Sequence, residues 1–463
     1  MQRIVEFDVP LGQGFARGRV PEGWHATLLE PTRQAALPDL GAAIAEALDA
    51  PMGSVPLAIL ARERADRARA AGVTPTATVV VTDATRDCPD DQFLPPLLAA
   101  IEGGGILADD TTLLVATGLH RPSTADEKRA KLGRDIADRY RVVDHDARDP
   151  RLIVEIGRTR GGIPATVNRL ALEADLLVAT GVVEPHQYAG WSGGAKTVAI
   201  GVAGEATIAA THGPSMIDEP GVRLGSLDGN PFHEAVVELG GRAGLAFVVN
   251  VVLDADNRAL AVAAGEPEVV HHVLAERAAR AVVVPLDRQA DVAIAGVGAP
   301  KDANLYQASR AVTYLHFAPI PAVRPGGVYV LPATIPEGAG AGLGERRFAE
   351  ALAWAAGAPD GPAELQRRLR RDGARAGEQR AYMVAAVLRD ASIIVVGAGD
   401  PGVPLAAGFR AAPDLGEALE LAGELARTSL SEADRGRPLD LLIVPHAIRT
   451  LPIVAARPPS SPS

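Results

Sequence analysis

Two histidines and one lysine surround a glycine-rich turn between Glu184 and His212, where the chain reads Glu-Pro-His-Gln-Tyr-Ala-Gly-Trp-Ser-Gly-Gly-Ala-Lys before continuing to the second histidine. A lysine amine can act as a nucleophile, and histidine serves both as a metal ligand and as an acid or base near neutral pH. Gly193 and Gly194 let the backbone approach a ligand closely and direct N–H groups toward an anion. The segment predicts a site in which Lys196 is a nucleophile and the histidines bind metal or move protons.

A phosphate-binding P-loop is the alternative interpretation of the same turn. The spacing from Gly190 to Lys196 and Thr197 matches G-x-x-x-x-G-K-[ST], except that Ala195 takes the place of the second glycine. A P-loop also follows its strand directly, whereas Glu184-Pro-His-Gln intervenes here. The P-loop is therefore the weaker interpretation.

Two further loops carry chemically capable side chains. One contains Asp83, Thr85 and Arg86, and the other contains His120 and Arg121. Arginine binds carboxylate or phosphate through paired hydrogen bonds, although an ordinary surface ion pair is the alternative for each. The aspartate and the threonine suit either ligand binding or capping of the next helix.

A fourth group lies on a helix expected over residues 303–315. Gln307 and Arg310 are three residues apart, and Tyr306 and Arg310 are four apart, so they share one helix face. That face could close over a ligand, and a solvated polar stripe is the alternative.

Buried strands are expected immediately before the three loops. The β-branched or apolar runs at residues 76–81, 111–116 and 174–183 alternate with helical patterns. This alternation predicts a mostly parallel sheet whose faces are both covered. Ligand sites of such sheets lie at the carboxyl ends of the strands, where these loops begin.

The alternation starts again in the second half of the chain. We expect two α/β domains, residues 1–285 and 286–455, with the active site in a cleft between them and a disordered tail at residues 456–463. A hinge near Pro285 would let the second domain close. Residues 337–344 hold a G-x-G-x-x-G-like pattern, but no acidic residue follows at the required distance, so a flexible loop is favoured over a dinucleotide site.

Composition narrows the class of protein. The 463 residues carry a formal net charge of −11, which argues against a nucleic-acid partner or an anionic membrane. The single cysteine, Cys88, allows no intramolecular disulfide. No apolar leader or membrane-length run occurs, so a cytoplasmic location is expected.

Several separated motifs together resemble the nickel-pincer-nucleotide lactate racemase family. The segment from Glu184 to Lys196 is similar to that family's signature, and the other landmarks follow in the same order. These landmarks are Asp83-Ala-Thr-Arg, Thr117-Gly-Leu-His-Arg-Pro, Gly201-Val-Ala-Gly, Thr211-His212, Gly229-Asn-Pro and Leu305-Tyr-Gln-Ala-Ser-Arg.

The resemblance implies a cofactor and roles for the site residues. Lys196 would be joined covalently to a nickel-pincer nucleotide (a pyridinium-3-thioamide-5-thiocarboxylic acid mononucleotide), loaded by cofactor-synthesis proteins, and His212 would bind the nickel. His120 and His186 would be the two acid/base residues on opposite sides of a 2-hydroxy acid, while hydride passes to and from the cofactor. The cofactor phosphate would lie near Asp83, Thr85, Gly193 and Gly194.

Substrate binding is the remaining implication. Arg86 would bind the substrate carboxylate, helped by Tyr306, Gln307 and the residue at position 310. Lactate racemases usually carry lysine where this chain has Arg310, so a 2-hydroxy acid other than lactate is expected, such as one with a second polar or acidic group. The alternatives are an NAD-type dehydrogenase that uses Gly338 to Gly344, and a catalytically inactive binding protein of the same fold.

Overall fold

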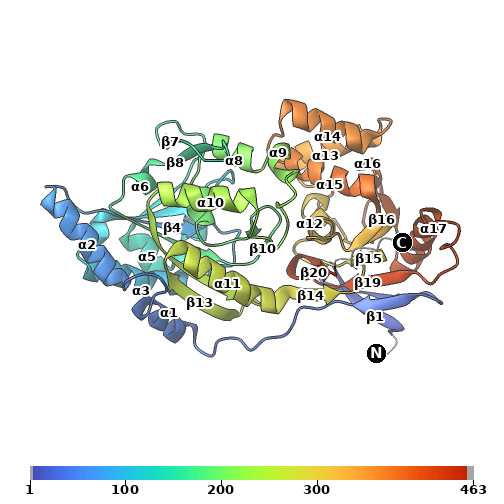
Figure 1. Cartoon of the computed structure of the whole chain (residues 1–463), viewed down its shortest axis with the longest axis horizontal. Helices are drawn as coiled ribbons and strands as arrows, with labels where there is room; N and C mark the ends of the chain where they lie inside the picture. Colours follow the sequence, from blue (N-terminus) through green and yellow to red (C-terminus); the bar gives the residue numbers. More distant parts are fainter. Residues whose placement is uncertain (1–3, 456–463) are drawn as a thin grey trace, which may run out of the picture.

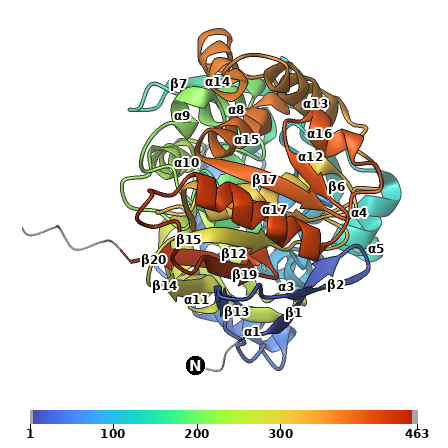
Figure 2. The same cartoon turned by 90° about the vertical axis from the view of Figure 1, so that its right-hand side faces the viewer.

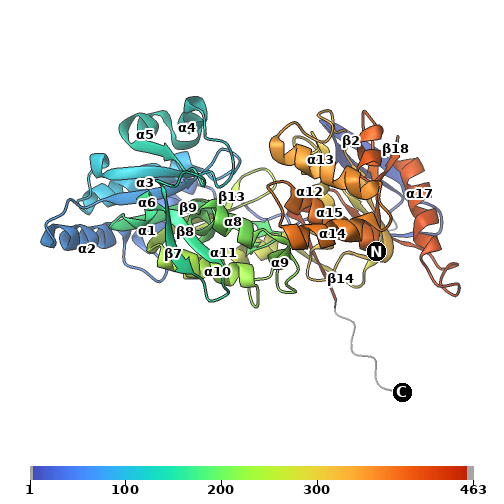
Figure 3. The ribbon, with the colours of Figure 1, turned by 90° about the horizontal axis from the view of Figure 1, so that it is seen from above.

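The protein, described here by a computed structural model that covers residues 4–455, has two α/β halves. Figure 1 shows them side by side, and Figure 3 shows the same division from above. The tail that was expected to be disordered, residues 456–463, lies outside the described residues. Within residues 4–455, no helix has the length and apolar character needed to cross a bilayer.

The first half is built on a six-stranded sheet in the order β13-β12-β9-β4-β5-β6. Its strands are β4 (Ala77–Thr82), β5 (Thr111–Ala116), β6 (Arg141–Asp144), β9 (Leu176–Val182), β12 (Leu245–Leu253) and β13 (Ala259–Gly265). Every neighbouring pair is parallel except β12 and β13. The expected mostly parallel sheet is therefore confirmed, and the ends of β4, β5 and β9 lie along one edge.

Both faces of this sheet are covered, which explains the continuous apolar strands. In β4, Val79 and Val81 join one buried cluster, and Val80 joins another on the opposite face. The helices that cover the faces include α1 (Leu40–Asp49), α2 (Leu57–Ala70) and α3 (Asp90–Gly103) on one side and α11 (Pro267–Val282) on the other. A strand buried on both sides needs an apolar residue at every position rather than at alternate ones.

The second half holds another six-stranded sheet, in the order β18-β17-β16-β15-β19-β3, in which all neighbours are parallel. Its strands are β3 (His25–Leu28), β15 (Ala290–Ala295), β16 (Val323–Pro332), β17 (Ala391–Val396), β18 (Arg410–Ala412) and β19 (Asp440–Val444). On one face lies α17 (Leu415–Thr428), seen in front of the strands in Figure 2. On the other face lie α12 (Leu305–His316), α13 (Leu343–Ala356) and α15 (Glu378–Asp390).

The first residues of the chain pair with the second half. Strand β3 pairs with β19, and the hairpin of β1 (Glu6–Leu11) and β2 (Gly14–Arg19) packs beside it. The expectation that residues 1–285 form one unit is therefore corrected for this N-terminal segment. Its edge strand finds hydrogen-bond partners on β19, a contact that local sequence patterns do not encode. The boundary near residue 285 stays a prediction, and β14 (Val283–Leu286) pairs there with β20 (Leu451–Val454).

Two segments that could be continuous helices are divided. The run Ile163–Leu172 forms β8 (Pro164–Asn168) and a short helix, α6 (Arg169–Leu172). The long helical pattern at Pro362–Arg389 is interrupted, giving α14 (Gly361–Asp372) and then α15. Gly377 sits at the break with φ +97°, and a Cβ there would lie 1.9 Å from the carbonyl oxygen of Gly344. Only glycine allows that approach.

Candidate functional site

The glycine-rich turn lies between a small hairpin and one turn of helix. After β9, the strands β10 (Pro185–His186) and β11 (Gly190–Trp191) pair antiparallel, and α7 (Lys196–Ala199) begins five residues later. This hairpin separates the lysine from its strand, which is unlike a P-loop. Gly194 has φ +54°, and a Cβ there would lie 2.8 Å from His271. Its N–H donates to Asn250 Oδ1 at 2.6 Å. The turn is thus held against β12 and fixes where Lys196 begins.

The environment of Lys196 disfavours the protonated form of its amine. Burial, followed by the positive charge of Arg86, lowers the pKa of its amine to about 7, against the opposing charges of Glu184 and Asp83. A neutral amine carries the lone pair that a nucleophile needs. Lys196 is therefore suited to form a covalent bond near neutral pH.

His120 forms a pair with Asp83. Its Nδ1 lies 2.7 Å from Asp83 Oδ2, and the hydroxyl of Thr85 donates to Asp83 Oδ1 at 2.6 Å. Burial by itself would raise the pKa of Asp83, but the hydrogen bonds from His120 and Thr85 outweigh it and the pKa is lowered. An ionised carboxylate at Nδ1 holds the proton there, which leaves the Nε2 lone pair available as a base. The predicted contribution of Asp83 and Thr85 to phosphate binding stays a prediction.

The hydrogen bonds of His186 favour the opposite placement of the ring proton. Its Nδ1 accepts from the backbone N–H groups of Tyr188, at 3.3 Å, and Ala189, at 3.1 Å. Burial lowers the pKa of His186 well below its usual value, and the charges of Lys196 and Arg86 add to the effect. The ring is therefore neutral and carries its proton on Nε2, so it can donate a hydrogen bond from that atom.

His212 ends α8 (Glu205–Thr211) with its Nδ1 3.0 Å from the carbonyl oxygen of Ile208. That contact places the ring proton on Nδ1 and leaves Nε2 with a free lone pair, the form that binds a metal ion. Burial, followed by the charge of Lys196, lowers the pKa of His212 to about 4. The ring packs edge-on against Tyr188 and Phe232, each with centroids 5.1 Å away. The neutral ligand form of His212 is thus the stable one.

Helix α12 brings the second half to this hairpin. The side-chain amide of Gln187 donates to Thr313 Oγ1 at 2.6 Å, and the hydroxyl of Tyr188 contacts Met383 Sδ of α15 at 3.2 Å. Among the α12 residues predicted to bind substrate, Arg310 is partly buried, and its charge contributes to the lowered pKa of His186, whose main cause is burial. Tyr306 packs against Phe348, and the Gln307 backbone N–H is capped by Asn304. Of these three residues, Arg310 is the one whose charge acts on His186.

Arg86 lies at a more open part of the same region. Its Nη1 is 3.4 Å from Glu184 Oε1, and its side chain is 35% exposed. The positive charge of Arg86 reaches both Lys196 and His186, where it adds to the effect of burial in lowering each pKa. An incoming carboxylate would compete with Glu184 for this guanidinium group.

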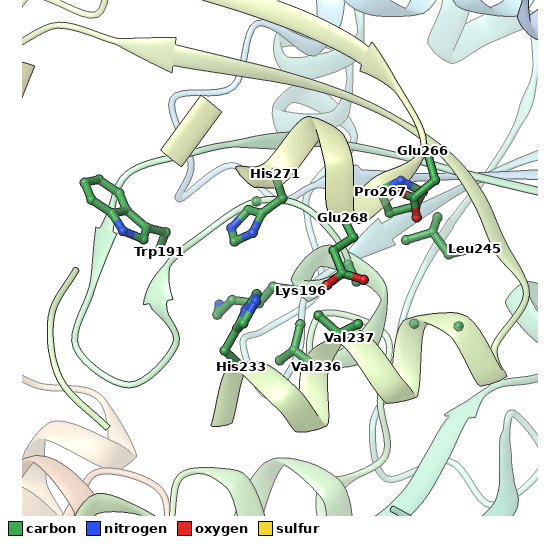
Figure 4. A pocket seen from close by; sticks show the side chains of 14 residues that line it. Trp191, Lys196, His233, Val236, Val237, Leu245, Glu266, Pro267, Glu268 and His271 are labelled. Atoms are coloured by element: carbon green, nitrogen blue, oxygen red, sulfur yellow. The ribbon is translucent and has the colours of Figure 1, made fainter. Parts of the chain in front are cut away.

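A cavity of about 160 Å³ lies behind the turn (Figure 4). Its lining includes Lys196, the rings of His233 and His271, and Glu268. The two rings stack with centroids 5.3 Å apart, and His271 Nε2 lies 3.0 Å from the carbonyl oxygen of Ser192. His271 is only 5% exposed, because α11 packs on the turn. The cavity gives access to Lys196 from the side of α10 (Pro231–Arg242) and α11.

Sequence reasoning missed three residues of this region. Asn250, the one polar residue inside the apolar run of β12, holds the Gly194 N–H, and its buried Nδ2 has no hydrogen-bond partner within residues 4–455. That interruption was a usable signal. Tyr188 and Arg380 of α15 had no comparable signal, since a tyrosine in a hairpin and an arginine in a helix are ordinary.

The chain is similar to known proteins in sequence and in structure. Residues 11–225 match the family described as lactate racemase N-terminal domain. A lactate racemase of Thermoanaerobacterium thermosaccharolyticum is 36% identical over 263 residues, or 57% of this chain and 60% of that protein. One from Lactiplantibacillus plantarum is 36% identical over 273 residues, or 58% and 61%. These sequence matches thus span about three fifths of the curated relatives.

The structural similarity extends further along the chain. The lactate racemase apoprotein from Thermoanaerobacterium thermosaccharolyticum superposes with a TM-score of 0.81 at 27% identity, covering 97% of this chain and 100% of that one. Both α/β halves of the present fold are therefore found in that apoprotein.

Proposed function

We propose that the chain is a member of the lactate racemase family and racemises or epimerises a 2-hydroxy acid, because residues 11–225 match that family's N-terminal domain and the fold superposes on a lactate racemase apoprotein. The observation that carries the proposal is the set of side chains at one edge of the first sheet. A nucleophilic lysine, a histidine prepared to bind metal, and two histidines with opposite proton placement lie together there. An isomerase that takes and returns one proton on each side of a carbon needs such a set.

The residues present fit a nickel-pincer nucleotide. Lys196 would hold it covalently, because its amine is neutral near pH 7, and His212 would bind the nickel through Nε2. The buried Asn250 Nδ2 beside the turn of Gly193 and Gly194 is a donor ready for a polar group of the nucleotide. One histidine does not hold a metal ion alone, so the remaining ligands would come from the cofactor. When bound, this group supplies a reversible acceptor for the hydride on the α-carbon.

The protein's own residues would manage the proton and the substrate's position. Arg86 gives up its ion pair with Glu184 and binds the substrate carboxylate that lies beside the hydroxyl group. His120 takes the hydroxyl proton at Nε2, while Asp83 stabilises the resulting imidazolium. His186, on the other side of the oxygen, would return a proton as an imidazolium that solvent has protonated, and His120 would release to solvent the proton that it took. In the reverse direction His186 would take the hydroxyl proton and His120 would return one.

Arg310 bears on the identity of the substrate. Its guanidinium group is larger and flatter than an ammonium group and favours paired hydrogen bonds to a planar anion. In the Arg310→Lys variant, we expect lactate racemisation to rise relative to that of longer or more polar 2-hydroxy acids by about tenfold. Chiral chromatography of reactions with a panel of single enantiomers measures this ratio. Equal racemisation of lactate by variant and parent, with no other acid preferred, would contradict a role in substrate choice.

The first test of the proposal is intact mass combined with metal analysis. Protein co-produced with a cofactor-synthesis system should gain a mass increment located at Lys196 and about one nickel per chain. The loaded protein should then interconvert the enantiomers of at least one 2-hydroxy acid without added NAD. An unmodified Lys196 without nickel, beside a loaded lactate racemase from the same system, would refute the proposal in favour of a binding protein or another cofactor.

The NAD-type alternative has little support at residues 338–344. Oε2 of Glu345 accepts the N–H of Gly342 at 2.7 Å, so that carboxylate occupies the start of α13. A dinucleotide site needs that helix start for the pyrophosphate. The expected cytoplasmic location and the loading by cofactor-synthesis proteins remain predictions.

A further inference from the structure

Arg380 is a buried cation without a partner. It lies in the first turn of α15 and is 9% exposed, and its Nε and Nη1 have no hydrogen-bond partner within residues 4–455. No carboxylate of these residues approaches it within salt-bridge distance; its guanidinium carbon lies over the ring of Tyr306 at 4.9 Å. A positive charge in the first turn also opposes the helix dipole. Among the described residues, this charge therefore contacts the Tyr306 ring, but no hydrogen-bond acceptor meets its Nε or Nη1.

Arg310 of α12 shares this property at one nitrogen atom, while Tyr314 and the charge of Glu184 act on its guanidinium group. Its Nε is buried and has no hydrogen-bond partner among the described residues, and its guanidinium carbon lies 5.9 Å from the centre of the Tyr314 ring. Both arginines act on Tyr188: burial raises the pKa of its hydroxyl to about 12, against the positive charges of Arg380 and Arg310. The Tyr188 ring in turn contacts the rings of His186 and His212. The two guanidinium groups are therefore close to the proposed reaction site.

Two other partly buried arginines, in contrast, form ion pairs with a buried carboxylate. Arg324 and Arg437 both bind Asp291, which is 1% exposed, with nitrogen–oxygen distances of 2.6 and 2.7 Å. Removing a charge from water is unfavourable unless an opposite charge or hydrogen-bond acceptors replace the water. For Arg310 and Arg380 the chain supplies no such carboxylate within residues 4–455, so the acceptor is expected to be a ligand.

We propose that Arg310 and Arg380 form a second anion subsite that binds the distal carboxylate of the substrate, which is therefore a 2-hydroxy dicarboxylate. The inference rests on the proposed function, because that function assigns the carboxylate beside the hydroxyl to Arg86. Two planar guanidinium groups with unused inner nitrogens match the paired oxygens of a carboxylate. A monocarboxylic acid such as lactate would leave both groups unpaired, which makes it the poorer substrate.

The subsite can be tested on the apoprotein, without any turnover. Calorimetric titration with glutarate, a dicarboxylate that lacks the reacting hydroxyl, should show binding at least tenfold tighter than titration with butyrate. In Arg380→Gln this preference should disappear, and in Arg380→Lys it should be kept in part. Arg389→Gln is the matched control, because Arg389 lies on the same helix, is exposed, and donates to Gln366. The control should bind glutarate like the parent.

The outcomes separate the subsite from the proposed function. Equal binding of glutarate and butyrate by the parent, or an equal loss of both in Arg380→Gln, would overturn the dicarboxylate assignment. If Arg380→Gln fails to fold, glutarate and butyrate binding are compared in Arg380→Lys and in Arg310→Gln instead. If both of these variants keep the parent's full preference for glutarate, the dicarboxylate assignment is overturned. Arg380-dependent glutarate binding, in a protein that takes up nickel but racemises no acid, would support the subsite and refute the racemase.

Discussion

The Lys196→Met variant is expected to carry no covalently attached cofactor when it is produced beside the synthesis system that loads the parent. Methionine fills a similar volume but has no amine, so the bond to the cofactor cannot form. Intact mass should show the unmodified chain, and nickel content should fall at least tenfold. Retention of the parent's mass increment would place the attachment elsewhere.

Lys301→Met is a matched control for this loss. Lys301 is also partly buried, and burial lowers its pKa as well, with a further effect from the charge of Arg310. If a low pKa alone determined attachment, both lysines would be labelled. We expect only Lys196 to be labelled, because it alone of the two begins the helix that follows the turn of Gly193 and Gly194. The Lys301→Met chain should therefore load normally.

The Lys196→Met variant should also be more stable than the parent when both are apoproteins near pH 7. The folded-state pKa of Lys196, about 7, lies below its usual 10.5, so the unfolded chain binds more protons between these values and stability rises with pH in that window. Removing the amine removes this cost, by roughly 1–3 kcal/mol after allowance for partial exposure. Urea unfolding at pH 7 and pH 10 measures it, and a gain that grows with pH would contradict the assignment.

The second large effect is expected from the two histidines. His120→Ala and His186→Ala should each keep the mass increment and the nickel but lose about 10²–10⁴-fold in racemisation rate, because each removes one proton-transfer group. Chiral chromatography in both directions, with nickel analysis on the same samples, measures these losses. Activity within a few-fold of the parent in either variant would end the two-base scheme.

The Asp83→Asn variant should show a smaller effect of the same kind. The amide keeps the size of the side chain but offers Nδ1 of His120 no negative charge, so the base form with a free Nε2 is less favoured. We expect a loss smaller than that of His120→Ala, with nickel content unchanged and with part of the rate restored by Asp83→Glu. His186, whose Nδ1 is held by backbone N–H groups, should be unaffected.

Local sequence was sufficient for the elements that carry the site. Apolar runs with β-branched residues identified β4, β5 and β9, because strands buried on both faces admit little else. The chemically capable loops followed from the strand ends, because parallel strands end along one edge. Their residues were thus found without coordinates.

Tertiary structure decided which of these residues act on one another. The proton placement on His120 and His186 depends on Asp83 in one case and on two backbone N–H groups in the other. Arg380 reaches Tyr306 across more than seventy residues of chain, and β3 joins a sheet formed mostly by the second half. Periodicity and motif spacing report only on neighbours along the chain. Contacts between distant segments, and the burial that shifts the pKa of Lys196, arise only when the elements pack.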